Sequence, residues 1–277
     1  MIVGQLIDCD FDNSECIDEW KAFLEANRNA FELVRVGLSR KSRVPVEGKH
    51  HLAELKWLSL ALQAEGRIAE KQNRLDDAIT SYLDVIRLSQ QIRGGTIIDA
   101  LVSLAIESTG MKPLQEVSDK MTTDQRRRVT KALVEIQSKR ASFDEVMENY
   151  TDSVNTYSFR ERLSGLRYYF SVRDAKRRLE AKIKYRQARI GVLLVDLAVR
   201  NYHAEKNHPP KILTELVPKY LPFLPKDDFS GKDFVYRPKS NGFVLYGVGP
   251  DGKNDGGKPL VIKGDVWPGG MLPNSGY

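Results

Sequence analysis

Apolar residues recur at helical spacing through the first half of the chain, and this pattern predicts a largely helical body. Five segments place apolar side chains three or four positions apart, at about 15–38, 52–72, 75–91, 96–108 and 123–138. Asn13 or Ser14 is a suitable amino-terminal cap for the first helix, and Thr123 for the last. Gly110 and Pro113 predict a break after 96–108, followed by a short helix to about Val117.

The pattern changes in the second half, where one long helix is followed by short strands. Residues from about 167 to 206 are first basic and then strongly apolar, and Pro209–Pro210 ends the helix near Asn207. Residues 211–217 allow one or two more helical turns. Residues 234–236 and 243–246 have the β-branched and aromatic content of strands, and the Ser-Asn-Gly sequence at 240–242 supplies a hairpin turn. We therefore expect a helix packed against a small antiparallel sheet.

Segment 58–91 resembles a tetratricopeptide repeat. The resemblance rests on small and aromatic residues at the repeat's spacing: Leu62, Gly66, Ala69, Asn73, Ala78, Tyr82 and Val85. Asn73 stands where the repeat usually has glycine, and Asn tolerates the left-handed conformation that the turn needs. Because the chain contains one such unit, a helical hairpin inside a bundle is favoured over a peptide-binding superhelix.

Segment 188–258 resembles the globular domain of the major pseudopilin of type II secretion systems. The resemblance rests on a spaced series of residues: Tyr202, Pro209, Pro210, Leu213, Leu216, Leu224 to Asp227, Ser230, Gly231, Phe234, Tyr236, and Gly242 to Gly257. It implies a small α+β domain and an extracytoplasmic place in a bacterial envelope. The apolar amino-terminal helix of pseudopilins has no counterpart here, so filament assembly is not implied.

The same resemblance implies a calcium site in the loop after the last strand. The ligands would be the carbonyls of Leu245 and Gly247, the carboxylates of Asp251 and Asp255, and the Asn254 side chain. Calcium prefers six to eight oxygen ligands, which a glycine-rich loop can turn inward. The alternative is a solvated Gly/Asp turn that holds no ion.

These patterns together predict a mainly α protein in three parts. A helical bundle with the tetratricopeptide-like hairpin would occupy 1–158, a basic connecting helix 159–189, and a pseudopilin-like α+β domain with a short antiparallel sheet 190–277.

Charge changes the picture at one segment. The chain has a net charge of +6, whereas residues 160–189 hold eleven Lys/Arg against three Asp/Glu, which gives +8. The candidate anion-binding residues are Arg173, Lys176, Arg177, Arg178, Lys182, Lys184, Arg186 and Arg189. They fit a membrane surface or an anionic polymer. Because the cations encircle the helix and no nucleic-acid motif accompanies them, a solvated helix is the favoured alternative and nucleic acid is a disfavoured partner.

The remaining chemistry points away from catalysis. The four histidines are scattered, and phosphate-binding and serine-hydrolase motifs are missing. A bridge between Cys9 and Cys16 requires an oxidising compartment. No segment is apolar enough for a transmembrane helix. We therefore expect a non-enzymatic scaffold or interaction module with a protein partner and calcium as the one candidate cofactor. The alternative is a binder of anionic polymers or membrane surfaces through residues 160–189.

Overall fold

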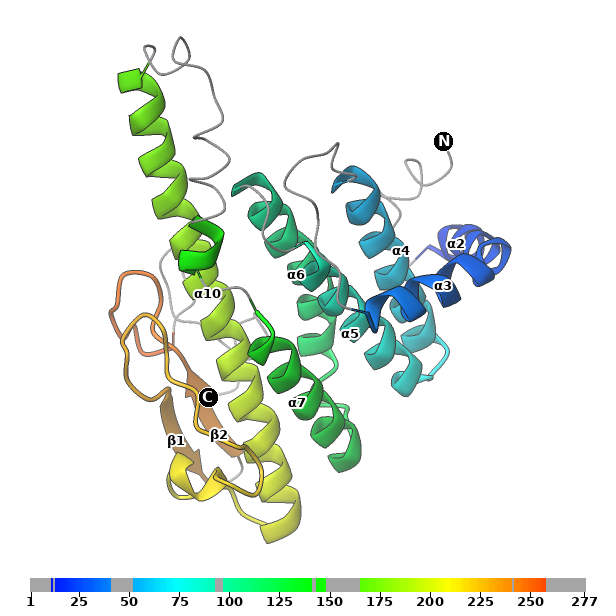
Figure 1. The fold of residues 1–277 in the computed structure, drawn as a ribbon. Coiled ribbons are helices and arrows are strands. Elements are labelled where there is room, and N and C mark those ends of the chain that lie inside the picture. Colours follow the sequence, from blue (N-terminus) through cyan, green and yellow to red (C-terminus); the bar gives the residue numbers. More distant parts are fainter. Residues whose placement is uncertain are drawn as a thin grey trace. The chain divides into compact units, whose positions relative to one another are not determined.

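The protein is mainly helical, with one two-stranded antiparallel sheet (Figure 1). The computed structural model describes residues 11, 13–40, 52–92, 97–140, 143–147, 165–240 and 242–257, with side chains of the long helix described from residue 176. The chain forms two compact units. The first comprises 1–114 and 140–179, the second comprises 115–139 and 180–277, and the domain limits expected at 158 and 189 stay predictions.

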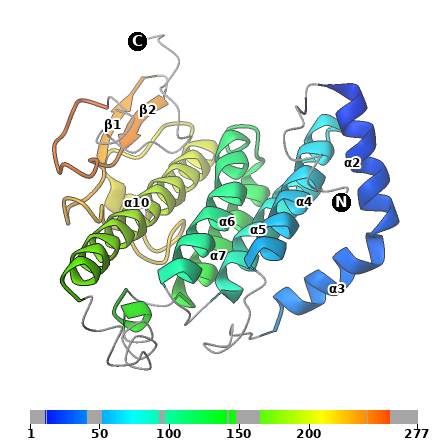
Figure 2. The same cartoon turned by 90° about the horizontal axis from the view of Figure 1, so that it is seen from above.

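The first unit is built from successive helices around a hairpin. Its labelled helices are α2 (Ser14–Ala26), α3 (Arg28–Leu38), α4 (Leu52–Lys71), α5 (Leu75–Gln91) and α6 (Ile97–Glu116), the last as far as residue 114. Helices α4 and α5 lie side by side, and α2 and α3 pack against them (Figure 2). Asn73 takes the expected left-handed conformation at the turn, with φ of 57°.

The α4–α5 hairpin depends on a close approach between Gly66 and the buried ring of Tyr82. A Cβ atom on Gly66 would lie within 2.8 Å of three Tyr82 ring carbons, so only glycine admits the ring here. The Tyr82 hydroxyl donates a hydrogen bond to Glu70 Oε1 at 2.5 Å. The helical hairpin predicted at 58–91 is therefore present, and its likeness to a tetratricopeptide repeat stays a prediction.

The predicted helix at 15–38 is wrong in one respect, because it is two helices. Asn27 separates α2 from α3. Its side-chain amide donates to the Phe23 carbonyl at 2.8 Å, and its backbone N–H is shared between the carbonyls of Phe23 and Leu24. An Asn side chain that competes in this way for the carbonyl four residues back favours a helix end. Asn13, as expected, caps α2 through a bond from Glu15 N.

The predicted break at Gly110 and Pro113 is also wrong, because α6 continues to Glu116. A Cβ on Gly110 would lie 2.6 Å from the Tyr82 carbonyl oxygen, so this glycine serves the contact between α5 and α6. Pro113 leaves the carbonyl of Thr109 without its helical donor. Gln63 Nε2 on α4 donates to that carbonyl at 3.1 Å. Tertiary contacts therefore keep the helix intact.

The second unit contains α7 (Thr123–Ser138), residues 180–206 of α10 (Gly165–Lys206), the short 3₁₀ helix η1 (Leu213–Leu216) and strands β1 (Val235–Lys239) and β2 (Gly242–Tyr246). The strands pair with Tyr236 opposite Leu245, which confirms the predicted hairpin. Helix α10 carries the core of this unit, because an unbroken run of its residues from 190 to 199 is buried.

The sheet is attached to α10 through Phe234. A Cβ on Gly191 of α10 would lie 2.7 Å from the Phe234 ring, and one on Gly247 would lie 3.1 Å from it, so two glycines admit this ring. The buried Asp227 side chain fixes the adjoining loop. It accepts hydrogen bonds from Val248 N at 2.9 Å, Phe229 N at 3.1 Å and the Ser230 hydroxyl at 3.0 Å.

Candidate functional site

A pocket in the second unit lies beside α7, whose start is fixed by a capping box. Thr122 Oγ1 accepts from Gln125 N at 3.3 Å, and Gln125 Oε1 accepts from Thr122 N at 2.9 Å. The cap residue is therefore Thr122, one position before the predicted Thr123. Arg127, Lys131 and Glu135 follow at intervals of four and are all exposed. This spacing places the three charged side chains along one side of the helix.

Glu215 orders the segment that leads from α10 toward the pocket. Its carboxylate accepts hydrogen bonds from the Tyr202 hydroxyl at 2.6 Å, Lys211 N at 3.0 Å and Ile212 N at 3.2 Å. These bonds lower the pKa of Glu215, with the Tyr202 hydroxyl as the largest cause. The end of α10 is thereby tied to η1.

The wall opposite α7 is the proline-containing turn 218–222. Tyr220 N and Leu221 N both donate to the Leu216 carbonyl, at 2.8 Å and 3.1 Å, and the Leu221 side chain is buried. Lys219 forms an ion pair with Glu205 on the last turn of α10. The pKa of Glu205 is lowered by that lysine first and by the Tyr220 hydroxyl second. The bonds to the Leu216 carbonyl and the ion pair between Lys219 and Glu205 therefore hold the turn in place.

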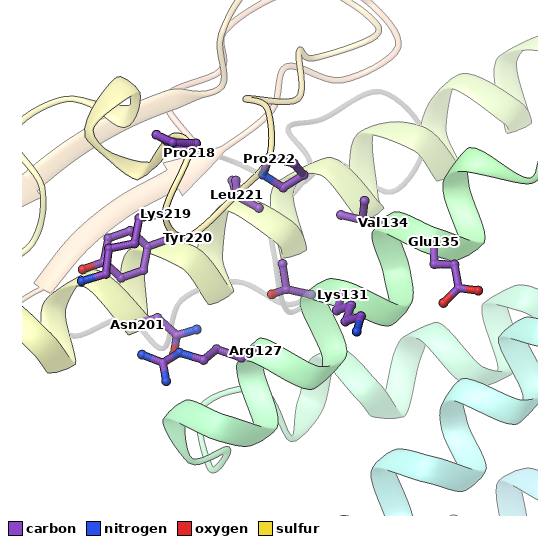
Figure 3. Close-up of a pocket in the computed structure, with 11 residues that line it drawn as sticks. Arg127, Lys131, Val134, Glu135, Asn201, Pro218, Lys219, Tyr220, Leu221 and Pro222 are labelled. Atoms are coloured by element: carbon purple, nitrogen blue, oxygen red, sulfur yellow. The ribbon is translucent and has the colours of Figure 1, made fainter.

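The pocket enclosed by these elements has a volume of about 600 Å³ (Figure 3). Its lining comes from α7, α10 and the turn: Arg127, Thr130, Lys131, Val134, Glu135, Asn201, Pro218, Lys219, Tyr220, Leu221 and Pro222. Figure 3 shows Arg127 on α7, Asn201 on α10 and Lys219 on the turn among these residues. The volume falls within the range of about 300–1,000 Å³ that is typical of ligand sites.

Three buried polar atoms of the lining have no hydrogen-bond partner among the described residues. They are Thr130 Oγ1 and Asn201 Oδ1, on residues that are 7% and 3% exposed, and the Tyr220 hydroxyl oxygen. Buried polar groups are nearly always hydrogen-bonded, because leaving one unsatisfied costs about 1–3 kcal/mol. A group that enters the pocket and bonds to one of these atoms would remove that cost.

The charges around the pocket are predominantly positive. Its lining contains the cations Arg127, Lys131 and Lys219 against the carboxylate of Glu135. Arg127 lies 3.5 Å from the exposed Asp124, and Glu135 pairs with Lys139 outside the pocket. Lys131 makes no ion pair with any residue that the structure describes. The entrance therefore favours an anionic group.

A buried ionic cluster lies on the same helices. Asp196 is 1% exposed and accepts from Arg200 Nε at 2.8 Å. Burial raises the pKa of Asp196, while Arg200 acts in the opposite direction. Burial likewise lowers the pKa of Arg126, and the nearby charge of Arg200 adds to this effect. The Asp196 carboxylate therefore lies close to the guanidinium groups of Arg200 and Arg126 and offsets their positive charge.

No family model, curated protein or solved structure matches this chain.

The loop predicted to bind calcium is organised by its own side chains. Asn254 Oδ1 accepts from the Tyr246 hydroxyl at 2.8 Å and from Gly256 N at 2.9 Å. Asp251 is exposed and accepts from Lys253 N at 3.0 Å. Asp255 Oδ2 is buried with no hydrogen-bond partner among the described residues.

The remaining predicted ligands, Leu245 and Gly247, lie at the end of β2 and directly after it. Within the described parts of the chain, no three His, Cys, Asp or Glu side chains are grouped as a metal site. Because two of the predicted ligands are backbone carbonyls and one is an Asn side chain, the calcium site stays a prediction.

The candidate anion-binding residues of α10 differ in their surroundings. Lys176, Arg177, Arg178, Lys182 and Lys184 are exposed, whereas Arg186 and Arg189 are partly buried. Lys176 Nζ lies 5.6 Å from the centre of the Phe143 ring, Lys184 pairs with Glu180 at 3.1 Å, and Arg189 donates to Gln115. The Arg173 side chain is outside the described part of the helix. Across the described residues, no helix has the length and apolar character needed to span a bilayer.

Sequence reasoning did not find the pocket. The spacing of Arg127, Lys131 and Glu135 was a visible signal of a charged helix side. However, Thr130 and Asn201 are 71 positions apart, and neither residue belongs to a motif. Only folding brings both to one cavity.

Proposed function

We propose that this protein is a non-catalytic interaction module, and that its pocket beside α7 receives a segment of a partner protein. The pocket carries this proposal. Val134, Pro218, Leu221 and Pro222 supply apolar walls, and the lining also contains Arg127, Lys131 and Lys219. Apolar walls with a few well-placed polar groups are what a recognition site requires.

The binding proposal is tested with peptides. Fluorescently labelled peptides of random internal sequence, with both ends blocked, and a second set with free carboxyl termini are titrated against the full chain. We expect at least one set to bind, and Lys131→Glu to weaken binding. Lys120→Glu is the matched control, because Lys120 is exposed in the same unit and outside the pocket lining. Failure of both peptide sets to bind would refute the proposal.

We also place the protein in an oxidising, extracytoplasmic compartment. Cys16 is disulfide-bonded, and the one other cysteine of the sequence, Cys9, lies outside the described residues. Disulfides persist in secreted and envelope proteins and are rare in the cytosol. The pseudopilin-like residue series supports the same location in a bacterial envelope.

A structural calcium ion in the loop after β2 is part of this proposal. The unpartnered buried oxygen of Asp255 supports it. An ion that binds only the folded protein raises stability by mass action. We expect millimolar calcium to raise the melting temperature relative to a chelator, and Asp251→Ala to remove that gain. Identical melting curves under both conditions would leave Asp251 and Asp255 as ordinary turn residues.

A second candidate function is binding to an anionic membrane surface or polymer through α10. The observation in its favour is that five of the eight candidate cations are exposed. We expect salt-sensitive retention on anionic vesicles or on DNA, lost on charge reversal at Arg177, Arg178, Lys182 and Arg186. The matched control reverses the exposed cations Lys21, Arg28, Lys71 and Lys112. Equal retention of the two variants would exclude the helix as the binding surface.

A further inference from the structure

The pocket beside α7 carries a more specific inference about its ligand. We propose that it recognises the carboxyl-terminal residue of a polypeptide, with an apolar side chain and a free carboxylate. This inference rests on the proposed function and names the chemistry of the partner's segment.

The unpartnered atoms define the first requirement. Asn201 Oδ1 is an acceptor and calls for an N–H donor, and the Thr130 hydroxyl can donate or accept. Both residues are more than nine-tenths buried, so a group that reaches them must enter the pocket. Because both atoms are already buried without a partner, a ligand that reaches them gains hydrogen bonds that the free protein lacks.

The charged lining defines the second requirement. Arg127 and Lys131 both line the pocket, and Lys131 follows one helical turn after Arg127. Lys131 has no ion-pair partner among the described residues, so it is free to meet an anion. An anionic oxygen group is therefore expected next to the N–H donor that satisfies Asn201.

The walls define the third requirement. Val134, Pro218, Leu221 and Pro222 present apolar surface between the polar groups. An aliphatic or aromatic side chain of the ligand is favoured there, because it removes its own apolar surface and that of the walls from water. Pro218 and Pro222 have fixed φ angles, which lowers the entropic cost of ordering this wall.

One chemical group satisfies the three requirements together. The last residue of a polypeptide carries an amide N–H, a carboxylate and a side chain on one Cα atom. An internal aspartate or glutamate places its charge on the side chain and so has no apolar group at that position. A phosphate ester has no N–H donor. Capture of a carboxyl terminus is a known mode of peptide recognition.

The experiment uses N-acetylated pentapeptides that differ only in the last residue, each made as the free acid and as the carboxyl-terminal amide. Affinity for the full chain is measured by titration calorimetry. We expect the free acids that end in an apolar residue to bind. Amidation should weaken binding at least tenfold, Lys131→Glu should do so as well, and Lys120→Glu should have no effect.

Thr130→Val separates a binding role from a structural one. Valine keeps the shape and removes the unpartnered hydroxyl, so the ligand-free protein should be as stable as the wild type or more stable. Its affinity for the free-acid peptides should nevertheless fall several-fold. A residue with only a structural role would instead lower stability and leave the ratio between acid and amide unchanged.

The outcomes are distinguishable. Equal binding of acid and amide would overturn the carboxyl-terminal inference, and so would an unchanged acid-to-amide ratio in Lys131→Glu. In both cases the proposal that the protein is an interaction module would remain valid. Binding by blocked internal peptides alone would also overturn the inference. Absence of binding by every peptide, blocked or free, would overturn the proposed function as well.

Discussion

Replacement of Gly66 by alanine is the sharpest test of how the first unit is packed. The added methyl group would lie within 2.8 Å of three carbons of the Tyr82 ring, whereas carbon atoms normally approach to about 3.5–4.0 Å. The ring is fully buried and its hydroxyl is bonded to Glu70, so it has little freedom to move away. We therefore expect α4 and α5 to be forced apart.

The magnitude follows from two opposing effects. Overpacking of a well-packed core costs about 1–3 kcal/mol, and this contact belongs at the upper end because the obstacle is a buried ring. Alanine in place of glycine inside a helix contributes up to about 1 kcal/mol in the opposite direction. We expect Gly66→Ala to lower the free energy of unfolding by about 2 kcal/mol.

Gly37→Ala is the matched control. Gly37 is also inside a helix, is exposed, and has no atom within 4 Å of an added Cβ. This variant should be more stable than the wild type by up to about 1 kcal/mol. The assay is urea denaturation of the full chain, together with hydrogen exchange of peptides from α4 and α5 to locate the loss of stability.

A double mutant identifies the cause. With Tyr82→Ala the obstacle is gone, so adding Gly66→Ala to that variant should no longer destabilise the protein. If Gly66→Ala alone stabilised the chain as Gly37→Ala does, the close approach between α4 and α5 would be disproved.

The remaining predictions concern four other features. Thr122→Ala should cost about 1 kcal/mol by removing the cap of α7, measured by urea denaturation; an unchanged midpoint would contradict the capping role. Asp227→Ala should cost about 1–3 kcal/mol because it leaves the buried Val248 N without its acceptor, and equal stability of variant and wild type would refute this role of Asp227. The pKa of Glu215 is lowered in the folded protein, so its contribution exists above the ordinary carboxyl pKa and disappears as pH falls through the folded value. The stability difference between wild type and Glu215→Gln should therefore shrink on acidification, and a constant difference would refute the linkage. Cys16 should resist alkylation in denaturant until a reductant is added, as mass spectrometry would detect; labelling before reduction would exclude the disulfide.

Local sequence signals were sufficient where each element depends on its own residues. The turn at Asn73, the end of α10 near Asn207 and the β1–β2 hairpin follow from left-handed turn residues, prolines and alternating strand residues. These features require only neighbours in the chain. For the same reason the predicted limits of α5 coincide with the observed Leu75–Gln91.

Tertiary contacts decided the positions where the local signal was ambiguous. Gly110 and Pro113 have the composition of a helix end, yet α6 passes through both residues. The Thr109 carbonyl that Pro113 leaves free finds a donor in Gln63, 46 residues before Thr109 in the sequence. At Asn27 the opposite happened, because a residue with no strong breaking signal ends α2 with its own side chain.

What the sequence by itself determined is most of the helices and the β1–β2 hairpin, since periodicity and turn chemistry act within a few residues. What only the tertiary structure decided is the pocket, because its lining joins α7, α10 and the turn 218–222. In the sequence alone, nothing distinguishes Thr130 and Asn201, which carry the unpartnered oxygens, from other polar residues of a helix. They become a candidate binding site only after folding removes them from water and sets Arg127 and Lys131 beside them.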